Sequence, residues 1–360
     1  MTDAGSLDEA VRAVDAPDVV FALSRHGRRT VRCGGTAPPP PVPRDRLRYE
    51  IGSASKTFTG LLLADLIQGG VLSGNDPAAS LLDPGRPPGR HPATVRHLMT
   101  HTSGLPPLPA DFYPQALPRW FTNPYAHYPP ERVVRAFFRA RLRHRPGTRW
   151  RYSNFAVAVL GHALAAATAT PWERLLTDRV LGPLGLHDTA LRPAAPGPAA
   201  PGPAVPGTDA TGHRTDGTTP VPPLRIGGFQ AAGALRATPH DLLTFLEAHL
   251  EAPRRPDGSP LTAALREVRR PLLRRGIGHA HTHTLAWFQH PADGGATMYF
   301  HIGATSGQVA FLGFRPDTGT ALVALSTRRY RREDALVPTA YALLSSSPGP
   351  SPGTSEDHPC

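Results

Sequence analysis

The sequence predicts an α+β protein in which one antiparallel sheet, built from both ends of the chain, carries a mostly helical lobe. Short apolar runs bounded by turn residues, which are typical of strands, occur at residues 19–33 and again at residues 279–326. Between them, longer stretches show helical periodicity, most clearly at residues 51–70 and 150–170. Because separate runs of strands and helices favour segregated layers, we expect the terminal strands to meet in one sheet.

The N-terminal residues predict the first strands of this sheet. A short helix is expected over residues 7–14, followed by a hairpin over residues 19–33 that turns at His26-Gly27. A Pro-rich connector, residues 36–43, then leads toward the first long helix.

Residues 51–70, IGSASKTFTGLLLADLIQGG, predict a helix that is apolar nearly all round and therefore buried. Ser53 and Lys56, three residues apart, share a face at its first turn. Burial and the positive end of the helix dipole both favour a neutral lysine, which could accept the serine proton. A Ser-x-x-Lys pattern by itself is more often a capped, solvated helical turn.

Lys56 is the only lysine in the chain, and the other 38 of the 39 Lys and Arg residues are arginines. A guanidinium group does not deprotonate in a protein, whereas a buried amine can. This composition, together with the buried helix, favours a catalytic role for Lys56 over a solvated turn.

Residues 106–130, here called the aromatic loop, follow a short capped segment at residues 76–82 and a predicted helix at residues 94–100, and they contain many prolines. Such a stretch is expected to be irregular, because proline breaks helices and strands. Its aromatic side chains predict a pocket wall or lid, with a satellite cluster covering the core as an equal alternative. The lid candidates are Phe112, Tyr113, Trp120, Phe121 and Tyr125.

The rest of the middle region completes the helical lobe. Residues 131–143 predict a basic helix, and residues 150–170 predict a helix of small residues that starts near a Tyr-Ser-Asn tripeptide, residues 152–154. A further helical stretch follows over residues 172–181. Residues 194–223 are dominated by Pro, Ala, Gly and Thr and predict a flexible surface insertion.

The C-terminal third returns to strands after a helix expected over residues 239–250. The predicted strands cover residues 279–288, 296–301, 308–314 and 320–326. A helix over residues 334–344 closes the fold, and the Ser/Pro/Gly-rich residues 345–360 predict a disordered tail.

We therefore expect a single domain over residues 1–344. Its sheet lobe would comprise about residues 1–50 and 225–344, and its helical lobe residues 51–224. A cleft between the lobes is the natural place for a site.

The formal charge of +11 raises the possibility of a nucleic-acid partner. The arginines are scattered, however, without aromatic interleaving and without zinc-finger or helix-turn-helix spacing, so no nucleic-acid partner is expected. No apolar run reaches the length of a membrane span, and no membrane association is expected.

Residues 1–16 are acidic and amphipathic, without the basic and apolar segments of a signal peptide, and this predicts a cytoplasmic protein. Two cysteines do not make a disulfide framework. His279, His281 and His283 alternate on a predicted strand, yet no carboxylate or cysteine accompanies them. We expect neither a metal nor another cofactor.

Three motifs stand in a fixed order: SASK at residues 53–56, YSN at residues 152–154 and HIG at residues 301–303. With LMTHTSGLP, PLGLHDT and AAGAL between them, the chain closely resembles the serine β-lactamase and penicillin-binding-protein superfamily, on its class C β-lactamase and family VIII esterase side. The likeness runs from about residue 19 to residue 344. Each motif alone is weak, whereas their order and spacing together are specific.

The resemblance implies a two-lobed β-lactamase/transpeptidase-like fold and an acyl-enzyme mechanism. Ser53 would be the nucleophile, and Lys56 would accept a proton or keep Tyr152 anionic. Tyr152 would be the general base and later pass its proton to the leaving group. Asn154 would orient Lys56 and the acyl side chain of the substrate.

The third motif would supply part of the oxyanion hole. The backbone N–H groups of Ser53 and of Ala304, which follows Gly303, would bind the oxyanion. Many β-lactamases and transpeptidases have lysine where this chain has His301, a residue mostly neutral at pH 7. This difference predicts weaker binding of a carboxylate and favours ester or amide substrates over β-lactams.

The sequence thus predicts a serine hydrolase acting on a small ester or amide. An acyltransferase with the same acyl-enzyme and an amine or alcohol acceptor is the close alternative. A β-lactamase or D,D-peptidase, or a binding protein without turnover, is less favoured. The sequence does not indicate an oligomeric state.

Overall fold

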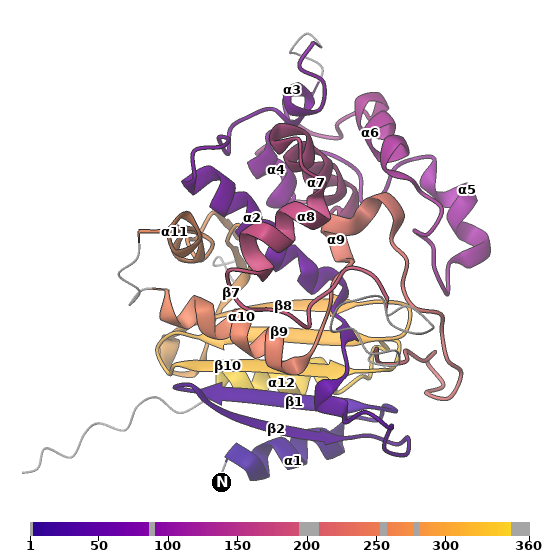
Figure 1. The fold of residues 1–360 in the computed structure, drawn as a ribbon, viewed down its shortest axis with the longest axis vertical. Coiled ribbons are helices and arrows are strands. Elements are labelled where there is room, and N and C mark those ends of the chain that lie inside the picture. Colours follow the sequence, from indigo (N-terminus) through magenta and orange to yellow (C-terminus); the bar gives the residue numbers. More distant parts are fainter. Residues whose placement is uncertain (1–2, 86–90, 194–208, 253–257, 277–280, 347–360) are drawn as a thin grey trace, which may run out of the picture.

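The computed structural model describes residues 3–85, 91–193, 209–252, 258–276 and 281–346. An antiparallel sheet with helices on both faces forms one lobe, and a cluster of helices forms the other (Figure 1). The predicted α+β class is confirmed. The proposed tail at residues 347–360 lies outside the described residues.

The main sheet has eight strands in the order β2-β1-β10-β9-β8-β7-β6-β5. Its strands are β1 (Val19–Arg25), β2 (Arg28–Gly34), β5 (Leu273–Arg275), β6 (His281–His283), β7 (Phe288–Pro291), β8 (Thr297–Ala304), β9 (Val309–Arg315) and β10 (Thr320–Ser326). A two-stranded sheet pairs β3 (Tyr49–Glu50) with β4 (Arg236–Ala237).

The two ends of the chain meet in the main sheet, as predicted: the N-terminal strands β2 and β1 form one edge, and the C-terminal strand β10 lies next to β1. β1 pairs antiparallel with β10, with Val19 opposite Ser326 and Arg25 opposite Thr320. Figure 1 shows the indigo N-terminal strands beside the yellow C-terminal ones. Every residue of β9 and β10 is buried, because helices cover both faces of the sheet.

The helices are α1 (Asp3–Ala13), α2 (Ser55–Gln68), α3 (Ala78–Leu82), α4 (Val95–Met99), α5 (Phe112–Ala116), α6 (Pro130–Arg139), α7 (Asn154–Thr168), α8 (Trp172–Leu176), α9 (Gln230–Gly233), α10 (Pro239–Glu251), α11 (Pro260–Glu267) and α12 (Leu336–Ser345). Alternate strand residues point into two cores. Val20 and Val323 belong to the large core shared with α2, α7 and α10, while Phe21 and Leu322 pack with α1 and α12.

Helix α2 runs through the large core, where its residues from Ser55 to Leu66 are all buried. It lies against α11, α9 and α7. The prediction of a helix buried nearly all round is confirmed. Ser53, however, lies outside it, in a separate 3-10 turn (Gly52–Ala54).

Several predicted element bounds differ from the structure. The strand expected over residues 279–288 is two short strands, β6 and β7, because Thr284 side-chain oxygen accepts hydrogen bonds from Ala286 N and Trp287 N and turns the chain. The aromatic loop is not wholly irregular, since it contains α5 and a 3-10 turn (Leu117–Arg119). α11 and β5 were not predicted.

The described part of the predicted insertion, residues 209–223, makes specific contacts with the rest of the chain. Asp209 forms an isolated backbone β-bridge with Arg48, and His213 forms one with Pro220 within the segment. Gln308 Nε2 donates to Ala210 O at 2.9 Å, which attaches the segment to the sheet lobe. Residues 194–208 lie outside the described residues.

The residues just after the predicted lobe boundary, at about residue 225, pack against the helical lobe. A 3-10 turn (Gly227–Phe229) and α9, both placed in the sheet lobe from the sequence, pack against α7 in the helical lobe. The Leu235 N–H just after α9 donates to Ser55 Oγ at the start of α2, which holds α9 beside that helix.

Within the described residues, no single helix has both the length and the apolar character needed to cross a membrane, although α7 and the segment Trp172–Leu181 would qualify together as a pair bent by 83°.

Candidate active site

Ser53 lies where the two lobes meet, in the turn that precedes α2. The turn brings it against β8: Gly52 has φ +49°, and a Cβ there would lie 2.6 Å from Ala304 O. Gly303 is closer still, since a Cβ on it would lie 1.8 Å from Ile51 O. Both positions therefore require glycine, and this close approach holds Ser53 beside β8.

Lys56 is completely buried and reaches the serine from the first turn of α2. Its Nζ donates to Ser53 Oγ at 3.1 Å and to Ala232 O of α9 at 2.6 Å. Burial lowers the pKa of Lys56 to about 7. A substantial neutral fraction is therefore present at physiological pH, as the sequence predicts.

Tyr152 approaches Ser53 from the start of α7. Its OH donates to Ser53 Oγ at 2.7 Å, and Lys56 Nζ lies 5.0 Å from its ring centroid. Burial raises the pKa of Tyr152 to about 12, against a smaller lowering effect of the hydrogen bond to Ser53. The phenol is therefore protonated at neutral pH, and the structure brings together the three side chains expected to act.

Asn154 begins α7 and lines the same pocket as Ser53. Its Nδ2 donates to Tyr125 OH at 3.1 Å, while its Oδ1 is buried without a hydrogen-bond partner in the described part of the chain. The partner of Lys56 that we expected in Asn154 is instead the Ala232 carbonyl. The free Oδ1 is available to a ligand.

Ala304 lines the pocket together with Ser53, at the position expected for an oxyanion hole. His301, two strand positions before Gly303, does not line this pocket. It is buried, and its Nδ1 lies 2.9 Å from Ile302 O. Burial, the largest cause, lowers its pKa to about 3, so it is neutral at pH 7.

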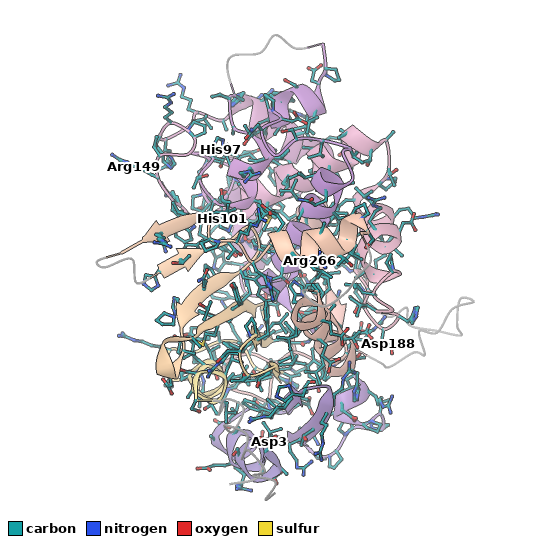
Figure 2. The ribbon with its side chains drawn as sticks, turned by 90° about the vertical axis from the view of Figure 1, so that its left-hand side faces the viewer. Asp3, His97, His101, Arg149, Asp188 and Arg266 are labelled. Atoms are coloured by element: carbon teal, nitrogen blue, oxygen red, sulfur yellow. The ribbon has the colours of Figure 1, made fainter. Side chains whose placement is uncertain are left out.

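His301 faces instead a rear cavity of about 20 Å³ behind Lys56, which His101 and His283 also line. His101 adopts a left-handed backbone (φ 58°), and its Nδ1 accepts from Ser153 N at 3.3 Å. Burial holds the pKa of His101 well below its ordinary value. Figure 2 shows His101 between the helical lobe and the strands of the sheet.

The pocket in front of Ser53 has a volume of about 150 Å³. Phe229, Ile226, Leu224 and Tyr125 give it an apolar side, and Thr305 and Ser306 a polar one. Its lining also includes one arginine, Arg329, whose guanidinium lies 5.0 Å from the Phe121 ring. The pocket lining therefore contains a cation, the guanidinium of Arg329, which follows β10, whereas His301 is neutral.

The lid candidates of the aromatic loop have different positions. Tyr125 lines the pocket, and Phe112 is fully buried beneath it, 5.0 Å from its ring, as a core residue. Tyr113 and Trp120 stack on each other at the surface, and neither lines the pocket. Phe112 is therefore part of the large core and not of a lid or a separate satellite cluster.

Sequence reasoning missed several lining residues. Arg329, Thr305 and Ser306 lie just after strand ends, a place where functional side chains are common, but nothing in their local pattern marks them. Ala232 lies in the AAGAL motif at residues 231–235. That motif is the one sequence feature that could have indicated that α9 supplies the carbonyl which accepts from Lys56.

No group of three or more His, Cys, Asp or Glu side chains that could hold a metal occurs in the described part of the chain. His281 Nδ1 lies 3.0 Å from His290 Nε2, and His283 Nε2 accepts a hydrogen bond from Arg275 Nε. His279 lies outside the described residues.

The sequence is similar to several known proteins. It is 34% identical to the D-alanyl-D-alanine-carboxypeptidase/endopeptidase AmpH of Escherichia coli K12 over 153 residues, which are 40% of this chain and 37% of that relative. The match thus spans little more than a third of that relative's length. A β-lactamase of Pseudomonas fluorescens is 25% identical over 329 residues, 82% of this chain and 84% of its own.

The fold matches solved structures over most of the chain. A D-stereospecific amidohydrolase from Streptomyces sp. superposes with a TM-score of 0.75 at 21% identity, covering 97% of this chain and 100% of that one. The family model described as Beta-lactamase matches residues 7–346. This chain therefore belongs to the β-lactamase family.

Proposed function

We propose that the protein is a serine hydrolase that forms an acyl-enzyme at Ser53 from a small ester or amide. One observation carries the proposal: Ser53 Oγ lies within hydrogen-bond distance of both Lys56 Nζ and Tyr152 OH, beside a pocket. Members of the β-lactamase family are serine hydrolases, and the family assignment supports the same class of reaction.

The pKa values suggest how the proton moves. Neutral Lys56 accepts the proton of Ser53 as Oγ attacks the substrate carbonyl carbon, and the carbonyl π electrons move onto the oxygen. The backbone N–H groups of Ser53 and Ala304 stabilise that oxyanion. Protonated Tyr152 then donates to the leaving oxygen or nitrogen and is reprotonated by Lys56.

Deacylation reverses these roles. Water gives a proton to neutral Lys56 as its oxygen attacks the acyl carbon. The Ser53 Oγ–carbon bond then breaks, Tyr152 gives its proton to Oγ, and Lys56 returns a proton to Tyr152. The lone Oδ1 of Asn154 accepts a hydrogen bond from the acyl part of the substrate, and the apolar side near Phe229 holds its carbon chain. A pocket of about 150 Å³ suits a short acyl group.

The test is intact-protein mass spectrometry after incubation with p-nitrophenyl esters of graded chain length and with a penicillin. We expect a short-lived acyl adduct that maps to Ser53 and is lost in Ser53→Ala, which should fold normally because the change is small. A stable protein that no acyl probe labels would favour a binding protein without turnover. An adduct retained in Ser53→Ala would place the nucleophile elsewhere.

Arg329 favours a second candidate within the same chemistry, a substrate that carries a carboxylate. Two of the similar proteins are described as a D-alanyl-D-alanine-carboxypeptidase/endopeptidase and a β-lactamase. A guanidinium in the pocket would bind such a carboxylate in place of the third-motif lysine. Rapid penicillin turnover in the same experiment would support this candidate over the neutral ester or amide.

The acceptor of the acyl group is tested separately. If an amine or alcohol replaces water, the protein is an acyltransferase with the same acyl-enzyme. Product analysis with and without an added amine distinguishes the two outcomes, because transfer yields an amide while hydrolysis yields the free acid.

A further inference from the structure

The helical lobe holds a second, larger cavity, a groove of about 580 Å³ that is separate from the pocket at Ser53. α6 forms one side, residues 140–143 continue it, and residues 106–111 form the other side. Phe155 of α7 also lines it. We call it the basic groove.

The groove takes its name from five arginines. α6 places Arg132, Arg135 and Arg139 on one helical face, at spacings of three and four residues. The next residues add Arg141 and Arg143, and the backbone N–H of Arg143 donates to Gly104 O at 2.9 Å. The same helix buries its other face, so its orientation is determined by the core.

Little negative charge balances these arginines. Asp111 is the one acidic residue that lines the groove, and it already accepts hydrogen bonds from Arg132 Nε at 2.8 Å and Tyr128 OH at 2.6 Å. Across the described ranges, the side chains of the other four arginines form no ion pair. The groove therefore has an unbalanced positive charge.

The remaining lining is apolar, with Pro106, Pro109, Ala136, Ala140 and Leu142. A volume of this size fits a small organic molecule, and apolar walls with a few charged groups are typical of ligand sites. A track for a nucleic acid would instead need cations along an extended surface with aromatic stacking. Charge around an apolar hollow favours a small amphipathic ligand.

We propose that the basic groove binds an organic anion with an apolar body, held by Arg135 and Arg139. A guanidinium matches either a carboxylate or a phosphate monoester, since both accept two parallel N–H bonds. The proposal does not depend on the reaction at Ser53.

The experiment is isothermal titration calorimetry of the full chain with 1-naphthyl phosphate and with 2-naphthoate, which separate the two anion types. 1-Naphthol supplies the apolar body without charge, and inorganic phosphate supplies the charge alone. The variant is Arg135→Glu/Arg139→Glu. The matched control, Arg12→Glu/Arg28→Glu, makes the same charge change at exposed residues of the sheet lobe.

We expect at least one naphthyl anion to bind, with affinity about tenfold lower in Arg135→Glu/Arg139→Glu and within about twofold of wild type in the control. Both 1-naphthol and inorganic phosphate should bind the wild-type protein more weakly than that naphthyl anion does. If the groove variant misfolds by circular dichroism, the milder Arg135→Gln/Arg139→Gln serves in its place, with Arg12→Gln/Arg28→Gln as its control.

Three results would overturn the proposal. One is the absence of binding by both naphthyl anions. Another is equal weakening in the groove and control variants, which would indicate a general effect of net charge. The third is unchanged binding in both, which would place the ligand elsewhere, for example at Arg329 in the catalytic pocket.

Discussion

Lys56 lies between two cavities that differ in size and chemistry. The pocket in front of it, about 150 Å³, contains Ser53 and the cation Arg329. The cavity behind it, about 20 Å³, is lined by imidazoles that include His101 and His301. One side offers a candidate nucleophile and space for a substrate, and the other is lined, apart from Lys56, by apolar side chains, threonines and neutral imidazoles.

The difference shows how one amine becomes a base. Burial is the cause of the lowered pKa of Lys56, and the neutral imidazoles behind it place no negative charge there that would raise that pKa again. An acidic residue at either imidazole position would favour the ammonium form. Burial alone thus accounts for the lowered pKa of Lys56, and the proposed reaction would use this amine on the front side.

The largest effect is expected for Lys56→Arg, which keeps a cation between the two cavities but cannot lose its proton. We expect kcat/KM for p-nitrophenyl esters to fall by about a thousandfold or more. Steady-state kinetics and a thermal melt measure this. Near-wild-type activity in a folded Lys56→Arg protein would refute the role of the amine as base.

Tyr152→Phe alters only the front side. We expect kcat to fall by about a hundredfold or more, because the proton donor to the leaving group is lost. In wild type, activity should fall below about pH 7, where Lys56 becomes protonated, and this acidic limb should stay in place in the variant. A pH–rate profile whose limb moves with Tyr152 would reassign the base.

Lys56→Met tests burial from the rear. The pKa of Lys56 is about 7 in the folded protein and 10.5 in the unfolded chain. Between pH 7 and pH 10.5 the unfolded chain therefore binds more protons than the folded one. Stability contributed by Lys56 therefore rises with pH in that window. Lys56→Met removes the cost of burying the amine, so its free energy of unfolding should exceed that of wild type. This excess should shrink by about 2 kcal/mol between pH 7 and pH 9.

Urea unfolding of both proteins at the two pH values measures this difference. Parallel pH dependence of the two proteins would mean that Lys56 titrates normally and is not buried as the structure has it.

The smallest effect is expected for Arg329→Gln at the front pocket. KM for an ester that carries a carboxylate should rise by about tenfold, with little change for a neutral ester of the same length. The ratio of kcat/KM for the two esters is the readout. An equal change for both would show that Arg329 supports the pocket without selecting charge.

Much of the fold could be predicted because its signals are local. Strand and helix periodicity placed most elements, and the arrangement of terminal strands around a helical middle predicted the sheet that joins β1 to β10. The predicted strand bounds were wrong where a side chain makes the backbone turn, as Thr284 does between β6 and β7. The Pro-rich aromatic loop failed for another reason, since tertiary packing of Phe112 supports a helix there.

By itself, the sequence determined the nucleophile candidate, the single amine near it and the order of the three motifs. The chemistry expected of Ser53 and Lys56 follows from residue type and a spacing of three, whereas the roles expected of the later motifs come from the family resemblance. Only the tertiary structure decided that Ala232 binds Lys56, that Arg329 enters the pocket and that His301 turns to the rear. These depend on segments far apart in sequence, and only the packing of the lobes brings them together.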